Sequence, residues 1–481
     1  MAHNKFLPRV LAAAAAMMLL AGCGSKADPG FSPANPVNIT IWTYYNGEQL
    51  EAFNALVDEF NSTVGKEQGI TVESSSHGSV TDLENNVLAS AEGKVGAEAM
   101  PNIFSAYADT AYALDEMGQI ADLSDYLSEE DRAAFIEDYL SEGDFSGSGS
   151  IKIFPVAKSA ELLFLNETDW EPFAAATGAT YDDLATIEGL VSVAERYYEW
   201  TDAQTPDIPN DGRAFFGRDA MANYMLIGAK QLGCTIFDAQ DGCMTLNFDH
   251  DAVRTLWDNY YVPFIKGYFS ASGRFRSDDV KTGNIIAYVG SSSSATFFPT
   301  QVIADDMDSH DITRKALESP KFANGEDYAV QQGAGMVVTK ASDAEIQASL
   351  VFLKWFTSPE HNITFSVDSG YLPVTHEGNS IDAIRISGLA LSDEMDEVLS
   401  AAVDTVNENH LYTPRAFSGG TNARAILEYS MSDKASADRA AVKEAMAQGQ
   451  SLEEASAQFL SDECFEAWYQ DTLASLEAFQ G

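Results

Sequence analysis

The chain has 481 residues and a formal net charge of −45 at neutral pH, from 73 acidic and 28 basic side chains. A surface this acidic repels nucleic acid and anionic lipid headgroups, which argues against a nucleic-acid partner. The length exceeds what a single hydrophobic core usually supports, so two lobes are expected.

The N-terminus has the pattern of an export signal. Lys5 and Arg9 precede an uncharged run from Val10 to Ala21 that is too short to span a bilayer comfortably. The following "LAGC" resembles the bacterial lipobox, whose cysteine is acylated and becomes the new N-terminus. We therefore expect a signal peptide over residues 1–22, a lipid on Cys23 and an exported protein anchored to the membrane outside the cytoplasm. An ordinary signal peptide with an incidental cysteine is the alternative.

Residues 23–36 contain Gly, Ser and Pro and little apolar material, which predicts an unfolded tether. The other cysteines are Cys234, Cys243 and Cys464, and none forms a CxxC pair, so we expect no metal site and no cofactor. The spacing of Cys234 and Cys243 permits a disulfide in an oxidising compartment and does not decide whether it forms.

The first part of the mature chain alternates strands with helices. "VNITIW" has the period of a strand, and Leu50 to Val64 carry an apolar stripe at helical spacing after Asn46 and Gln49, which have capping-box spacing. "ITVES" predicts a second strand, "DLENNVLASAE" a helix and "NIFSAY" a third strand. This order indicates an α/β fold with a mostly parallel, doubly wound sheet. Ligands bind beyond the carboxyl ends of such strands, here at "TYYNGE" and "AYADTA".

The second part begins with helices from about residue 181 to 270, followed by a strand in "NIIAYVGSSSSATFF" and a glycine-interrupted strand in "VQQGAGMVVTK". Next, Ser342 and Glu345 form a capping box, and Ser358 is a natural N-cap before Pro359. Gly370 is expected to end that helix. The C-terminal stretch is almost wholly helical.

The segments "FLKWFTSPEHN", "SGYLPV" and, near the start, "ALVDEFN" resemble the extracellular solute-binding proteins of ABC importers, in particular the carbohydrate and glycerol-3-phosphate binders. The resemblance implies a two-lobed clamp of the periplasmic-binding-protein type, each lobe a doubly wound, mostly parallel sheet. It implies chain crossings near residues 156–159, 290–293 and 333–335. Lobe I is then expected to hold residues 37–156 plus 293–333, and lobe II residues 157–292 plus 334–481.

The resemblance also implies site residues, carried over position by position: Ser159, Ser292, Ser293, Gly333, Tyr371 and Arg415. Arg424 competes with Arg415 for the arginine position. The acidic ligand-binding residue of the family falls near Ala108, with Asp109 one position on. Independently, aromatic loop residues at a strand end suit stacking on a sugar face, which adds Tyr44 and Tyr45 as candidates.

Together these features predict a solute-binding lipoprotein that captures a carbohydrate or polyol and delivers it to ABC permease subunits, without catalysis. A glycerol-phosphate compound is the alternative solute. A surface carbohydrate-active enzyme is a weaker alternative, because the sequence contains no HExxH, GxSxG or P-loop motif. An adhesin is a third class. His250 lies between Asp249 and Asp251, but Asp249 is better explained as a helix N-cap than as a metal ligand.

Overall fold

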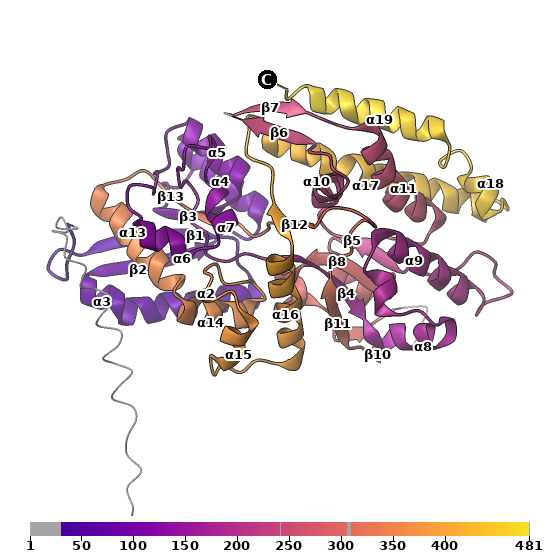
Figure 1. The fold of residues 1–481 in the computed structure, drawn as a ribbon, viewed down its shortest axis with the longest axis horizontal. Coiled ribbons are helices and arrows are strands. Elements are labelled where there is room, and N and C mark those ends of the chain that lie inside the picture. The colour runs from indigo at the N-terminus through magenta and orange to yellow at the C-terminus, as the bar shows by residue number, and fades with distance from the viewer. Residues whose placement is uncertain (1–29, 241, 305–308, 481) are drawn as a thin grey trace, which may run out of the picture.

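A computed structural model describes residues 30–240, 242–304 and 309–480, which form two lobes, each built around a four-stranded sheet (Figure 1). The predicted α/β class is confirmed. In the described ranges, no helix combines the length and apolar character that a membrane span requires. The predicted signal peptide, Cys23 and the beginning of the tether lie outside the described residues.

The first sheet has the order β13-β3-β1-β2 and is parallel except at β13. Alternation of buried and exposed residues along β1 places Ile39 and Ile41 in the core, as predicted. The strands are β1 (Val37–Thr43), β2 (Ile70–Ser76), β3 (Ile103–Ala106) and β13 (Gly335–Val338). The helices of this lobe are α2 (Gly47–Ser62), α3 (Val64–Gln68), α4 (Val80–Ala91), α5 (Ala108–Glu116), α6 (Glu129–Ala134), α7 (Glu137–Ser141), α13 (Asp343–Phe356) and α14 (Pro359–Ser369).

The second sheet is mixed, so the expectation of a mostly parallel sheet holds for the first lobe alone. Its order is β11-β4-β8-β5, with β4 antiparallel to both neighbours and β8 parallel to β5. Every residue of β4 is buried. A fully buried strand reads as one apolar run in either orientation, so the sequence carries no sign of its direction. The strands are β4 (Glu161–Asn166), β5 (Phe216–Arg218), β8 (Ala287–Ser291) and β11 (Arg314–Glu318).

The expected division of the late segments between the lobes is wrong. Strand β11, expected in lobe I, pairs with β4 of the second sheet, and β13, expected in lobe II, pairs with β3 of the first. After β8 the chain stays in the second lobe, through the 3₁₀ turn η2 (Ser292–Phe297), β9 (Gln301–Val302) and β10 (His310–Asp311). The chain therefore crosses near residues 156–159 and 332–335, and a third time after α14 rather than near 290–293.

Most of the second lobe is helical, and its helices bury a large aromatic core that includes Trp257, Tyr261, Phe465 and Trp468. Figure 1 shows the C-terminal helices α17 to α19 along the upper side of this lobe, and α16 close to the boundary between the lobes. Its remaining elements are α8 (Glu167–Thr177), η1 (Tyr181–Leu184), α9 (Ile187–Asp202), α10 (Met221–Gln231), β6 (Phe237–Gln240), β7 (Cys243–Leu246), α11 (His250–Lys266), α12 (Arg276–Lys281), β12 (Tyr328–Val330), α15 (Ile381–Ile386), α16 (Asp393–Glu408), β14 (His410–Tyr412), α17 (Gly420–Ala447), α18 (Leu452–Ser456) and α19 (Asp462–Glu477).

The predicted helix ends are mostly confirmed. Ser342 and Glu345 form the capping box of α13, Asp249 caps α11, and Gly370 ends α14 with a positive φ of 70°. The capping box at Asn46 and Gln49 does not form. Instead, Gln49 Nε2 donates to the backbone oxygen of Ser293 at 3.2 Å, so this side chain joins the first lobe to η2.

The tether prediction is wrong for its last residues. Phe31 is buried in the core of the first lobe, and Ser32 and Asn35 exchange backbone hydrogen bonds of 3.0 and 2.9 Å. These contacts place the segment against the lobe rather than in an unfolded tether. The disulfide that the spacing of Cys234 and Cys243 permits is not formed, because both cysteines are free. Cys234 Sγ lies 3.3 Å from the backbone oxygen of Asn247.

The close approach of α14 to η2 yields a prediction. A Cβ on Gly370 would lie 2.8 Å from the backbone oxygen of Ser292, whereas one on Gly388, also at positive φ, would meet nothing within 4 Å. Gly388→Ala should therefore cost about 1–2 kcal/mol of unfolding free energy, for the left-handed backbone alone. Gly370→Ala should cost roughly 1–3 kcal/mol more, because it also overpacks this contact. Urea denaturation measures both; equal costs would refute the contact.

Candidate functional site

A cavity of about 500 Å³ lies between the lobes, within the size range of small-molecule sites. Its first wall contains Tyr107, Ala108 and Asp109, so the cavity opens at the "AYADTA" loop, where the parallel strand β3 predicted a ligand site. The second wall comes from the beginnings of α10 and α17 and from the loop before α17. The lining includes Glu84, Tyr107, Asp109, Glu142, Asn223, Phe237, Gln331, Gln332, Arg415, Phe417, Gly420, Arg424, Glu428 and Tyr429.

Asp109 lies in the first turn of α5 and faces the other lobe. A Cβ on Gly420, the first residue of α17, would lie 2.3 Å from its Oδ1, so the carboxyl group abuts the positive end of that helix. Burial raises the pKa of Asp109 to about 6; the Arg424 charge opposes this shift and Glu142 adds to it. Asp109 is thus a half-buried hydrogen-bond acceptor, and its burial disfavours the ionised form of the carboxyl group.

Three further carboxyl groups line the cavity, and they differ in what they contact. Glu142 is ion-paired with the buried Lys158, and Glu428 accepts a hydrogen bond of 2.7 Å from the Ala222 backbone nitrogen. Burial raises the pKa of Glu84, which a hydrogen bond from Thr110 partly offsets. Glu84 and Asp109 therefore offer acceptors on the same wall of the cavity.

The opposite wall presents Arg424, which is held in place by a buried chain of polar groups. Arg424 donates to Asn223 Oδ1, and Asn223 Nδ2 donates to Glu161 Oε1 at 2.8 Å. Glu161 is in turn ion-paired with Arg218. All three supporting side chains are buried, so the guanidinium is oriented before any solute arrives.

Arg415 lines the cavity from the loop before α17 and is exposed. Within the described part of the chain it forms neither a salt bridge nor a hydrogen bond through its side chain. The two arginines that the sequence could not separate therefore lie in the same cavity, with different partners.

The predicted residues Ser159 and Gly333 belong to crossing segments beside the cavity. Ser159 N donates to Gln332 O at 2.9 Å, and its buried hydroxyl has no partner among the described residues. Gly333 adopts a φ of 95°, and its backbone oxygen accepts from Lys158 Nζ at 2.8 Å. A Cβ on Gly333 would lie 2.8 Å from the Ala157 oxygen, so close backbone packing requires glycine here.

Ser292, Ser293, Tyr371 and Tyr44 meet beside these crossings and outside the lining of the cavity. Ser292 is buried, and its hydroxyl donates to Gly370 O at 2.9 Å. The hydroxyl groups of Tyr44 and Tyr371 lie 3.3 Å apart. These side chains join η2 to the end of α14, so their polar groups contact the protein itself in this conformation.

Tyr45 is a core residue. It is 1% exposed, and its ring centroid lies 5.4 Å from those of Phe53 and Phe365 and 6.0 Å from that of Tyr371. No face of this ring is available for stacking on a sugar. The aromatic residues that do line the cavity are Tyr107, Phe237, Phe417 and Tyr429.

Several lining residues escaped the sequence analysis, among them Glu84, Asn223 and Glu428. Each lies on a helix and has no local motif that separates it from an ordinary surface or core residue. Tyr107 could have been predicted from the sequence, because it belongs to the "AYADTA" loop that follows β3. Asp109 lies in the same loop region and was named from the family resemblance, one position beyond Ala108.

A family model for bacterial extracellular solute-binding proteins matches residues 55–384. No curated protein sequence matches the chain.

The fold is shared with solved structures of low sequence identity. A cyclic alpha-maltosyl-1,6-maltose binding protein from Arthrobacter globiformis is 17% identical with a TM-score of 0.65, covering 92% of this chain and 100% of that one. UgpB from Mycobacterium tuberculosis, in complex with glycerophosphocholine, is 16% identical with a TM-score of 0.64 over 92% and 98%. Lmo0181 from Listeria monocytogenes, an ABC substrate-binding protein in complex with cycloalternan, is 15% identical with a TM-score of 0.63 over 92% and 99%.

The family model covers more than half of the sequence, and these structures share the two-lobed architecture over nearly all of it. The chain belongs to the family of bacterial extracellular solute-binding proteins.

Proposed function

We propose that the protein captures a carbohydrate or related polyol in the cavity between its lobes and delivers it to an ABC importer. The observation that carries this proposal is the composition of the cavity, which combines carboxylates, an oriented arginine and aromatic rings from both lobes. Sugar hydroxyls donate to carboxylates such as Asp109 and accept from Arg424, while apolar sugar faces pack on rings such as Tyr107 and the exposed Tyr429. The site needs no reactive group for this task.

The similar structures support this solute class. Two of the three described above are named for cyclic sugar ligands. They share the fold with this chain at low identity, so they support a sugar as the class of solute and leave its structure to be determined.

A glycerol-phosphate compound is the second candidate, and Arg415 favours it. An exposed guanidinium without a protein carboxylate is suited to a bidentate contact with a phosphate group. UgpB, a similar structure, holds glycerophosphocholine. Glu84 and Asp109 on the first wall would repel the phosphate, which is why a neutral carbohydrate ranks first.

Isothermal titration against neutral oligosaccharides and glycerophosphodiesters separates the two candidates. For a neutral sugar, Arg415→Ala should leave the dissociation constant near that of the wild type. For a phosphodiester it should weaken binding by at least about tenfold, since a charge-assisted hydrogen bond is lost. Arg274→Ala is the matched control, because Arg274 is exposed and lies outside the cavity lining. Binding of neither class by the wild type would contradict the proposal.

The pKa of Asp109 predicts how affinity depends on pH. As the pH falls from 7 to 5 through a pKa of about 6, the carboxylate is protonated and loses acceptor capacity, so carbohydrate affinity should decrease. Asp109→Asn should bind at least about tenfold more weakly at pH 7 and with a flatter pH profile. Asp58→Asn, at an exposed position of α2, should keep the wild-type profile. The same decline in both variants would remove Asp109 from the site.

The raised pKa of Asp109 means that its ionised form, which favours sugar binding, lowers the stability of the folded protein. Between the ordinary value of 3.8 and about 6, Asp109 binds a proton in the folded protein more readily than in the unfolded chain. The carboxyl group therefore lowers stability as the pH rises through this window. Asp109→Asn should not destabilise the protein at pH 7, so its weaker binding cannot be attributed to unfolding.

We infer from the lipobox resemblance that Cys23 carries a lipid that retains the protein beside its permease. Cys23→Ser should move the protein from the membrane fraction to the soluble fraction without changing its melting temperature. A variant that stays in the membrane after a salt wash would refute this anchor and leave solute binding unaffected.

A further inference from the structure

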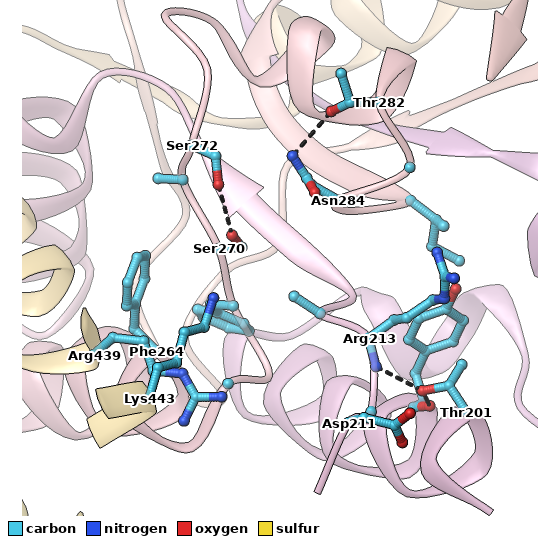
Figure 2. Close-up of a pocket in the computed structure, with 18 of the residues that line it drawn as sticks. Thr201, Asp211, Arg213, Phe264, Ser270, Ser272, Thr282, Asn284, Arg439 and Lys443 are labelled. Carbon is cyan, nitrogen blue, oxygen red and sulfur yellow. Dashed lines mark hydrogen bonds between the residues drawn. The ribbon is translucent and has the colours of Figure 1, made fainter. Parts of the chain in front are cut away.

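A second pocket, of about 740 Å³, lies wholly within the second lobe. It is bounded by the end of α9 and the loop after it, the C-terminal end of α11 and a late turn of α17. Arg439 on α17 is 15 residues beyond Arg424 of the interlobe cavity, which is about 22 Å along a helix. The two pockets are therefore separate. Figure 2 shows Arg439 and Lys443 on one side of this pocket and Thr201, Asp211 and Arg213 on the opposite side.

Two cations stand together on one face of α17. Arg439 and Lys443 are four residues apart, so their side chains are neighbours on the helix. Burial lowers the pKa of Arg439. Lys443 is exposed overall, and partial burial together with the Arg439 charge lowers its pKa. Neither forms a salt bridge within the described ranges, although the chain has 73 acidic side chains. An anion between them would relieve their mutual repulsion.

Arg439 is held in position by the end of α11. Its Nη1 donates to the Ile265 backbone oxygen at 2.8 Å, a favourable contact for a cation at a helix C-terminus. A Cβ on Gly267 would lie 2.3 Å from its Nη2, so glycine at this position leaves space for the guanidinium. This helix contact explains how Arg439 is oriented, but not why Lys443 stands beside it.

The rest of the lining contains a third basic side chain, Arg213, hydroxyl groups, and two acids, Asp169 and Asp211. The hydroxyl groups of Ser270 and Ser272 lie 3.4 Å apart in the pocket wall. Asp211 accepts a hydrogen bond of 2.6 Å from Thr205, and Asp169 accepts one of 2.7 Å from Asn166. The pocket therefore holds more basic side chains than acidic ones, together with hydroxyl donors, and this combination is suited to an oxyanion.

We propose that this pocket is a second ligand site, which takes a small soluble solute bearing a carboxylate or phosphate group between Arg439 and Lys443. The site is independent of the interlobe cavity, since the two share no lining residue. The proposal thus stands whether the cavity takes a neutral sugar or a phosphodiester.

Titration calorimetry with inorganic phosphate at millimolar concentration tests the site. The wild type should bind phosphate, and Lys443→Gln and Arg439→Gln should each weaken binding at least about tenfold. Lys443 is exposed, so its variant should fold even if Arg439→Gln disturbs the end of α11. Lys66→Gln, at an exposed position of α3, is the control for the change in net charge and should bind as the wild type does. In Arg415→Ala the phosphate binding that depends on Arg439 and Lys443 should persist.

Phosphate binding that survives Lys443→Gln and Arg439→Gln but is lost in Arg415→Ala would place the anion in the interlobe cavity and overturn the proposal. The absence of phosphate binding to the wild type would also overturn it. Sugar titration of Lys443→Gln should match the wild type, which keeps failure of this site distinct from failure of the proposed function.

Discussion

The arrangement of the lobes depends on backbone pairing between the chain segments that cross from one to the other. Lys158 N donates to Leu372 O at 3.2 Å, and Leu372 N donates to Lys158 O at 2.6 Å. The Lys158 ammonium is fully buried, which is tolerable because Glu142 and the Gly333 oxygen satisfy it. Since the crossings are tied together here and α5 already meets the beginning of α17, we expect any opening or closing of the lobes to bend these segments, as in hinge motion around a ligand.

Local signals predicted the first lobe well, because its strands and helices carry clear periodicity and caps. Alternation along β1, the Ser342 capping box and the stop at Gly370 were all read from neighbouring residues. What could not be read is strand partnership, which is set by packing between distant segments. Residues 314–318 were therefore assigned to the wrong lobe, and the sequence analysis did not predict that they form strand β11 beside β4.

The site was predictable where topology fixes it and unpredictable where side-chain environment does. The carboxyl end of the parallel strand β3 predicted the loop that lines the cavity, and the family resemblance named Asp109 just beyond it. Tyr45 follows β1 in the same way, yet its ring is turned into the core by Phe53 and Phe365. The sequence could not decide whether Arg415 or Arg424 occupies the family's arginine position. In the structure, only Arg424 donates to the buried Asn223, which in turn donates to Glu161.

A crystal structure of the protein with its bound carbohydrate tests the central claim most directly. We expect the sugar between α5 and α17, with a hydroxyl group within hydrogen-bond distance of Asp109 and another within reach of Arg424. Ring faces should pack on Tyr107 or Tyr429. A sugar bound elsewhere, with the interlobe cavity holding only water, would contradict the assignment of this cavity as the capture site.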